Sequence, residues 1–280
     1  MKQSITSETG DNTQADSNRR LWNNLASIHP QTKFYDVDGF IEGRCSLTEI
    51  EQDVLGDIAG KKVLHLQCHF GLETLSMARR GAAVTGVDFS DVAVRKARAL
   101  NDQLKLDAQF VCCDVNELDQ YLDDKYDLVF ASFGVIGWHC DLGKWARIVA
   151  HFMKDGGRFC FAEFHPVLWM LSDDHKRFEY SYFKGEVLVV ENEGSYADPD
   201  ATDMGTAYSW NHSLSELFQA LEDHGLVIRD FREYDYSPYP CFQDAVGENG
   251  RYRIKDLEKT LPLAYSLSAM KELRASVPAA

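Results

Sequence analysis

Short apolar runs alternate with helical patterns through the middle of the chain. Strands are expected at 61–66, 82–88, 108–114, 126–133 and 158–164. Helices are expected between them at 72–80, at 91–104 and from Asp141 to Gly156. Strands that alternate with helices in this way predict a parallel sheet covered on both faces. The expected fold class is therefore α/β, with a doubly wound, mainly parallel sheet.

The segment before this alternation reads differently. Residues 1–18 are polar and aperiodic, and we expect a disordered tail there. Apolar side chains then recur at helical spacing up to Pro30, at Leu21, Trp22, Leu25 and Ile28. A second helix is expected from Ser46 to Ile58, with Ser46 as its N-cap and Glu49 at the capping-box position. Residues 19–60 are thus predicted to form an N-terminal helical cap.

The alternation also breaks after the fifth strand. Residues 166–210 are rich in aromatic, acidic and turn-forming residues, which predicts an inserted lid within a main domain at 61–280. The same aromatic residues could instead form a contact between two copies in a homodimer. Ser213 with Glu216 predicts another capped helix, followed by a strand at 226–234 and an antiparallel strand within 261–269.

Charge and composition narrow the expected partners. The 29 Lys and Arg against 44 Asp and Glu give a formal charge of −15, which opposes binding to nucleic acid or to an anionic membrane surface. No apolar run approaches the roughly 20 residues needed to cross a bilayer. The first residues resemble neither a secretory signal nor a transit peptide, so we expect a cytoplasmic protein.

Polar side chains gather at the predicted carboxyl ends of the strands, where a doubly wound sheet binds its ligand. Asp88 ends the second strand, where its carboxylate can accept hydrogen bonds from two ribose hydroxyls. Asp114 ends the third strand and can accept a hydrogen bond from an adenine amino group. Phe89 offers an apolar face for the purine. These residues predict an adenosine nucleoside site.

The order of VLHLQCHFG, VTGVDFS, FVCCDV and YDLVFASFGVIGW resembles the class I S-adenosylmethionine-dependent methyltransferases. The strings EFHP, YSWNHSL and LPLAYSLSA also look like a bacterial subgroup of this superfamily whose substrates are mostly unassigned. The resemblance implies a seven-stranded Rossmann-like sheet of order 3-2-1-4-5-7-6 with strand seven antiparallel. It implies S-adenosylmethionine as cofactor and S-adenosylhomocysteine as product.

The resemblance also implies roles for single residues. Asp88 would hold the ribose, Phe89 would pack on the adenine, and Asp114 with the Val115 amide would read the adenine edge. Gln67, His69, Gly71 and Ser132 would surround the methionine portion. The complete expected cofactor site is Tyr35, Gln67, Cys68, His69, Gly71, Asp88, Phe89, Ser90, Asp114, Val115 and Ser132.

The first loop departs from the superfamily pattern, acidic-x-Gly-x-Gly-x-Gly. The corresponding positions here are His65, Gln67, His69 and Gly71. Glycines permit positive φ and a close approach of the backbone to the ligand, so the substitutions predict a reshaped or a lost pocket. We favour a reshaped pocket, because the ribose and adenine acceptors remain. His65, Cys68 and His69 could also hold a metal, but no second ligand group supports this reading, and no metal is expected.

Methyl transfer to a small-molecule acceptor by in-line displacement is the expected function. His165 and His139 are the candidate catalytic bases, although hydrogen bonding could equally explain His165. The candidate acceptor site comprises Trp138, His139, His165, Tyr182 and His212. Two alternatives remain open: a module that binds S-adenosylmethionine or S-adenosylhomocysteine without turnover, and a protein methyltransferase.

Overall fold

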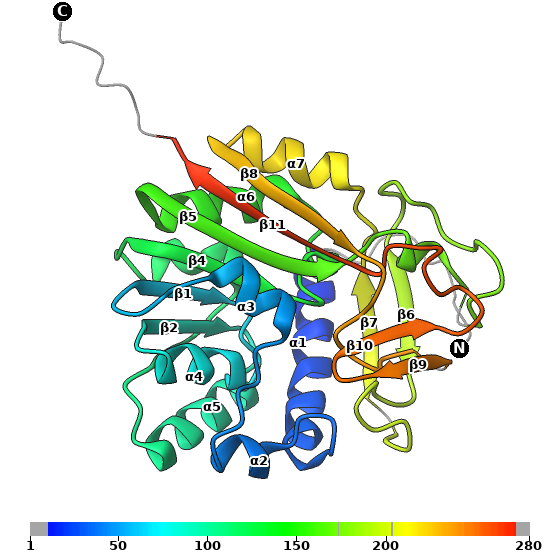
Figure 1. The fold of residues 1–280 in the computed structure, drawn as a ribbon, viewed down its shortest axis with the longest axis horizontal. Helices are drawn as coiled ribbons and strands as arrows, with labels where there is room; N and C mark the ends of the chain where they lie inside the picture. Colours follow the sequence, from blue (N-terminus) through cyan, green and yellow to red (C-terminus); the bar gives the residue numbers. More distant parts are fainter. Residues whose placement is uncertain (1–10, 173, 203, 243, 273–280) are drawn as a thin grey trace, which may run out of the picture.

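A seven-stranded sheet forms the centre of the computed structural model, which describes residues 11–172, 174–202, 204–242 and 244–272 (Figure 1). The strand order is β3-β2-β1-β4-β5-β11-β8. The strands are β1 (Lys62–Leu66), β2 (Ala83–Asp88), β3 (Gln109–Cys112), β4 (Tyr126–Ser132), β5 (Met153–Phe164), β8 (Leu226–Tyr234) and β11 (Ala264–Lys271). Neighbours from β3 to β5 run parallel, whereas β11 runs antiparallel to β5 and β8. The predicted order and the antiparallel last strand are confirmed.

Helices cover both faces of the sheet, as the alternating pattern predicts. On one face lie α4 (Leu72–Arg79) and α5 (Asp91–Leu104), which pack against β2 and β3. On the other face lie the 3-10 helix η2 (Val115–Gln120), α6 (Leu142–Phe152) and α7 (Leu214–Glu222). The helices change face between β3 and β4 because right-handed crossovers lead outward from β1 in both directions.

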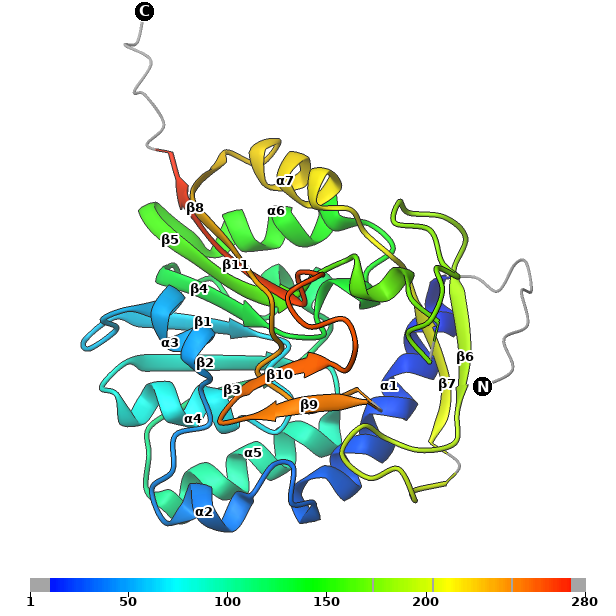
Figure 2. The same ribbon diagram turned by 45° about the vertical axis from the view of Figure 1, so that its right-hand side comes forward.

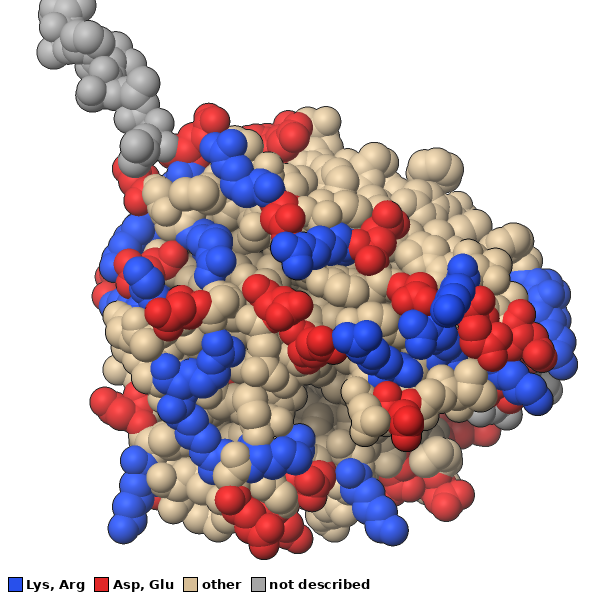
Figure 3. Space-filling model, in the orientation of Figure 1, with Lys and Arg blue, Asp and Glu red and all other residues tan. Residues whose placement is uncertain are grey.

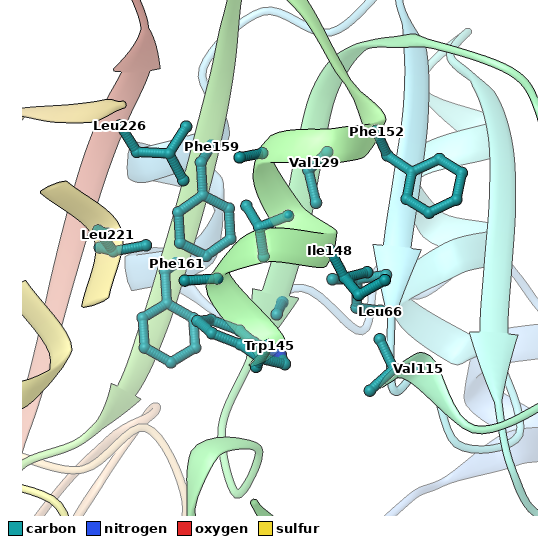
Figure 4. Packing of buried hydrophobic residues seen from close by; sticks show 14 of the residues in the cluster. Leu66, Val115, Val129, Trp145, Ile148, Phe152, Phe159, Phe161, Leu221 and Leu226 are labelled. Atoms are coloured by element: carbon teal, nitrogen blue, oxygen red, sulfur yellow. The ribbon is translucent and has the colours of Figure 1, made fainter. Parts of the chain in front are cut away.

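The larger core lies between α6, α7 and the sheet. Trp145 of α6 is fully buried and contacts the rings of Phe159 and Phe161 on β5, with centroid distances of 5.6 Å and 5.5 Å (Figure 4). Leu221 and Leu226 close this cluster on the α7 side. This packing fixes β4 and β5 against α6 and so holds the strand ends that face the ligand site.

The N-terminal helix is longer than the sequence predicts. Helix α1 spans Asp11–Ile28, so residues 11–18 of the expected disordered tail are helical, and residues 1–10 lie outside the described residues. Polar contacts stabilise this part: Asn18 donates to the Tyr208 carbonyl and accepts from the Tyr208 amide, both at 2.8 Å. The hydrophobic pattern could not reveal this extension, because its contacts are hydrogen bonds.

The cap continues through η1 (His29–Gln31) and α2 (Val37–Ile41), and then α3 (Glu49–Leu55) begins. The N-cap of α3 is Thr48 with Glu51, rather than the expected Ser46 with Glu49. Both pairs have the capping-box spacing, and tertiary contacts decide between them. Ser46 hydrogen-bonds Ser76 on α4 instead.

Two hairpins cover the carboxyl edge of the sheet (Figures 1 and 2). The first, β6 (Leu188–Asn192) with β7 (Gly205–Ser209), lies in the expected lid and packs against α1. The second, β9 (Ala245–Glu248) with β10 (Arg251–Ile254), is not predicted from the sequence. Arg251 pairs with Glu49 and Arg253 with Asp235, which attaches this hairpin to α3 and the end of β8.

Lys and Arg side chains are interspersed with Asp and Glu over the face shown in Figure 3, which therefore offers no extended basic surface. Among the helices within the described ranges, none is long and apolar enough to cross a membrane.

Candidate functional site

A cavity of about 1630 Å³ opens at the carboxyl ends of the parallel strands. Its floor carries Gln67 after β1, Asp88 at the end of β2, Asp114 after β3, Ser132 at the end of β4 and Glu163 near the end of β5. This is the switch point of a doubly wound sheet, where ligands bind. The cavity exceeds the roughly 300–1,000 Å³ of a typical ligand pocket, so it has room for two molecules side by side.

Segments distant in the chain cover the cavity. Trp22 comes from α1, Tyr35 from the turn after η1, Ser195 and Trp210 from the lid, and Tyr239 from the segment after β8. Aromatic rings therefore form much of the cover, while charged and polar groups occupy the floor.

The first loop keeps the left-handed backbone that glycines would favour, although two of its positions are not glycine. The φ angles are 55° at Gln67, 50° at His69 and 85° at Gly71. Hydrogen bonds hold this conformation: the His69 amide donates to Asp88 Oδ2 at 2.8 Å, and Gln67 Nε2 donates to the Val135 carbonyl at 3.2 Å. The loop thus keeps a glycine-like backbone with larger side chains, and a cavity lies beside it.

Gly71 has a packing role. A Cβ atom at this position would lie 2.8 Å from the Phe110 ring, so a larger residue would force a shift. Gly71 is not among the residues that line the cavity, so its place in the structure indicates packing rather than the expected contact with the methionine portion.

Asp88 and Asp114 lie where the sequence places them. Asp88 is buried at the end of β2 and accepts from the amides of His69 and Ser90, and burial raises its pKa to about 6. Asp114 Oδ1 accepts from the Asn116 amide at 2.8 Å. Both carboxylates, with Phe89 and Val115, line the same cavity. The expected nucleoside residues are therefore brought together.

His65 at the end of β1 is buried and neutral. Its Nδ1 lies 2.8 Å from Thr74 Oγ1, and burial lowers its pKa to about 3. Among the described residues, no group of three His, Cys, Asp or Glu side chains is placed to hold a metal ion. His65, Cys68 and His69 thus line a cavity without forming a ligand set.

The loop after β4 is organised by Glu163. Its carboxylate accepts from the amides of Gly134 at 2.6 Å, Val135 at 2.7 Å and Phe164 at 2.7 Å. A buried carboxylate with this many amide donors fixes the backbone that carries Trp138 and His139. Hydrogen bonds to one carboxylate therefore stabilise the wall between the strand ends and the lid.

Residues 63–157 match the family described as a methyltransferase domain. A relative named ubiquinone biosynthesis O-methyltransferase, from Bordetella pertussis, is 36% identical over 190 residues, which cover 67% of this chain and 70% of the relative. The chain belongs to the class I S-adenosylmethionine-dependent methyltransferase superfamily. It is an enzyme that transfers a methyl group from S-adenosylmethionine to a small-molecule acceptor.

Solved structures of methyltransferases share this fold. An S-adenosylmethionine-dependent methyltransferase from Clostridium acetobutylicum superposes with a TM-score of 0.56 at 16% identity, covering 90% of this chain and 99% of the other. The 1,6-didemethyltoxoflavin-N1-methyltransferase of Burkholderia thailandensis superposes with a TM-score of 0.54 at 16% identity, covering 96% and 94%.

Most of the expected cofactor residues line the cavity of this methyltransferase. They are Tyr35, Gln67, Cys68, His69, Asp88, Phe89, Asp114, Val115 and Ser132. Ser90 does not line it: its hydroxyl accepts from the Ala93 amide as the N-cap of α5 and donates to Asn23 Oδ1 at 2.6 Å. The hydrogen bonds of Ser90 thus indicate a capping role rather than the expected contact with the cofactor.

The candidate catalytic residue His165 is also outside the cavity lining. Its Nδ1 accepts from the Val167 amide at 3.2 Å, and its Nε2 lies 3.0 Å from Glu233 Oε1. Glu233 belongs to β8, so the His165 imidazole is directed toward that strand. These contacts favour the hydrogen-bonding role for His165 over the catalytic one.

Trp138, His139 and His212 line the cavity, whereas Tyr182 does not. The Tyr182 hydroxyl instead accepts from the Leu214 amide at 3.3 Å, near the start of α7. His212 Nε2 donates to the His139 carbonyl at 2.7 Å, and its Nδ1 lies 3.1 Å from Glu216 Oε2. His139 Nε2 lies 3.0 Å from Gln67 Oε1, and burial lowers the pKa of His139 to about 4.

Sequence reasoning missed several residues that face or support the cavity. They are His29, Glu51, Glu73, His175 and Tyr196. Glu73 and His29 occupy positions that a helical or turn pattern treats as ordinary surface. Only their contacts with distant segments reveal them.

Proposed function

We propose that the cofactor lies across the ends of β1 to β4. Asp88 would accept the ribose hydroxyls, and Asp114 with the Val115 amide would bind the adenine edge against Phe89. The methionine portion would lie along Gln67, His69 and Ser132, and bound S-adenosylmethionine would supply the activated methyl group. The observation that carries this assignment is that the acids ending β2 and β3 face one cavity with the reshaped first loop.

The remaining part of the cavity suits an apolar, ring-containing acceptor. Phe164, Trp169 and Trp210 line it, and the Phe164 and Trp169 rings are 5.7 Å apart in an edge-to-face contact. Such walls bind planar molecules and exclude water. The main task of the protein is then to hold the attacking atom in line with the methyl carbon, and positioning of this kind contributes roughly 7–11 kcal/mol.

A hydroxyl is the proposed attacking group. The Bordetella pertussis relative is named an O-methyltransferase. A hydroxyl must lose its proton, and His175 supplies a base in this proposal, because it lines the cavity and its Nδ1 is buried without a hydrogen-bond partner. His139 is less suited, since both of its ring nitrogens lie near protein groups, and His212 uses its Nε2 to donate to the His139 carbonyl.

The domain boundaries follow from the same geometry. In this proposal, residues 11–60 form a helical cap, residues 61–272 form the catalytic domain, and residues 166–210 form the lid over the acceptor. The −15 charge supports a small acceptor rather than nucleic acid.

Methyl transfer from labelled S-adenosylmethionine to a panel of phenols tests the proposal. Product formation by the wild type is expected, together with a loss of roughly 10²- to 10⁴-fold in kcat for His175→Gln. Lys176→Gln, an exposed neighbour, is the matched control. If the wild type forms product and His175→Gln has the same kcat, His175 is not the base. If S-adenosylhomocysteine does not bind, the assignment of the cofactor residues is wrong.

A further inference from the structure

His139 lies between the loop that follows β1 and the loop that follows β3. It comes directly after the 3-10 helix η3 (Ile136–Trp138), is 6% exposed and lines the cavity. Its Nε2 lies 3.0 Å from Gln67 Oε1, and its Nδ1 lies 3.4 Å from Asn116 Nδ2. Because burial lowers its pKa to about 4, the ring is neutral at pH 7 and only one of its two nitrogens carries a hydrogen. The neighbours of the ring decide which nitrogen that is.

The residues after β3 require that Nδ1 is the nitrogen without a hydrogen. Asn116 Nδ2 donates to Asp114 Oδ1 at 3.0 Å, and the backbone amide of Asn116 donates to the same oxygen at 2.8 Å. A reversed side-chain amide is unfavourable, because its oxygen would then lie against a carboxylate oxygen. Nδ2 of Asn116 therefore faces His139 as a donor, and His139 Nδ1 accepts from it.

The residues after β1 and β4 require that Nε2 carries the hydrogen. Gln67 Nε2 donates to the Val135 carbonyl at 3.2 Å, so Gln67 Oε1 is the atom that faces His139. An amide oxygen only accepts hydrogen bonds, and His139 Nε2 must therefore donate to it. Both sides of the ring thus require the same tautomer, although the arguments use different residues.

The backbone and the ring of His139 are also held in place. Its amide donates to the Ile136 carbonyl at 3.1 Å, and its carbonyl accepts from His212 Nε2 at 2.7 Å. Its ring centroid lies 6.2 Å from that of the fully buried Trp145. The lone pair of Nδ1 is directed at Asn116, so it is not free to take a proton from an acceptor. These contacts indicate a structural link rather than a base.

We propose that His139 is a positioning residue, whose ring joins Asn116 to Gln67 through one accepted and one donated hydrogen bond. The proposal rests on the proposed function, in which Asp114 and Gln67 contact different parts of the cofactor. Gln67 has a φ of 55°, which residues other than glycine rarely adopt. Its side-chain amide is held at both ends, by Val135 and His139. His139 thus stabilises the first loop in its cofactor-binding shape without contacting the reacting atoms.

Nuclear magnetic resonance of the imidazole nitrogens tests the tautomer in the wild type without any ligand. At pH 7 we expect a hydrogen on Nε2 of His139 and none on Nδ1. The signals are assigned to this residue by their absence from His139→Gln. A hydrogen on Nδ1, alone or together with one on Nε2, overturns the proposal, because Asn116 then has no acceptor on the ring.

Binding of S-adenosylhomocysteine to His139→Gln and His139→Phe tests the effect on the pocket. A glutamine can still donate to Gln67 Oε1, whereas a phenylalanine keeps a ring beside Trp145 but has no polar atom. We expect His139→Phe to weaken binding about 5- to 30-fold, as for a buried polar group left without its partner, and His139→Gln to weaken it less than about threefold. The opposite order overturns the proposal, because the ring then serves packing alone. His151→Gln, exposed on α6, is the matched control.

A double variant tests whether His139 acts through Gln67. If the two residues form one link, His139→Phe combined with Gln67→Met should bind S-adenosylhomocysteine no more than about twofold more weakly than the weaker single variant. Additive losses overturn the link, and circular dichroism checks that each variant folds. Failure of the wild type to bind S-adenosylhomocysteine contradicts the cofactor assignment instead. The tautomer measurement is independent of that result, so the two failures are distinguishable.

Discussion

His29 Nδ1 lies 2.9 Å from His69 Nε2, and His29 Nε2 lies 2.8 Å from Ser195 Oγ. One buried imidazole thus joins the N-terminal cap, the first loop and the lid. The Tyr35 ring stacks on His29, with a centroid distance of 4.9 Å. The left-handed His69 is therefore held from outside the loop, which explains how a residue other than glycine keeps this conformation.

Replacement of His29 should change how stability depends on pH. Burial lowers the pKa of His29 to about 4, so the folded protein keeps it neutral while the unfolded chain protonates it near 6.5. The wild type therefore loses stability as the pH falls below about 6.5, and by pH 4.5 this histidine accounts for about 2.5 kcal/mol. His29→Gln should lack that part of the loss, as measured by urea unfolding from pH 7.5 to 4.5. Parallel curves for both proteins would contradict this.

The affinity for 5′-methylthioadenosine should depend on pH through the ionisation of Asp88. Burial raises the pKa of Asp88 to about 6, and only the ionised carboxylate accepts both ribose hydroxyls. The dissociation constant should rise about tenfold for each pH unit below 6 and stay flat above 7. Asp88→Asn should bind weakly at every pH.

His165→Gln should affect stability more than catalysis. His165 contacts Val167 and Glu233 and lies outside the cavity lining. We expect a loss of about 1 kcal/mol in the free energy of unfolding and less than a threefold change in kcat. A 100-fold loss of kcat in His165→Gln with an unchanged free energy of unfolding would indicate that His165 acts as a base after all.

Asn18→Ala should loosen the lid. The Asn18 side chain makes both of its hydrogen bonds with the backbone of Tyr208 on β7, and we expect a loss of about 2 kcal/mol. Limited proteolysis should then cut residues 166–210 faster than in the wild type. Asn24→Ala, which removes a single bond to the Met204 carbonyl, is the matched control and should have a smaller effect.

The sheet and the nucleoside residues were predictable because they depend on local signals. Strand β8 lies at the predicted residues, 226–234, and Asp88 and Asp114 follow directly from the ends of strands. The periodicity of apolar residues predicts the positions of such residues without information on the tertiary structure.

The cover of the cavity was less predictable, since it depends on long-range polar contacts. Asn18 and Ser195 act through partners 190 and 166 residues away. His165 shows the same limit: its place after β5 indicates the site, but its side chain lies beside Glu233 on β8 and is not among those that line the cavity. Packing, rather than sequence order, decides toward which side of a strand end a side chain points.

The floor of the cavity belongs to the strands, whereas its cover comes from α1, residues 166–210 and the segment around Tyr239. In the proposed function, the residues that would bind the nucleoside come from the strand ends, whereas much of the cover over the acceptor comes from other stretches of the gene. We therefore expect insertions or exchanges in the covering stretches to change the acceptor while the nucleoside residues stay unchanged. Engineering of specificity should begin there.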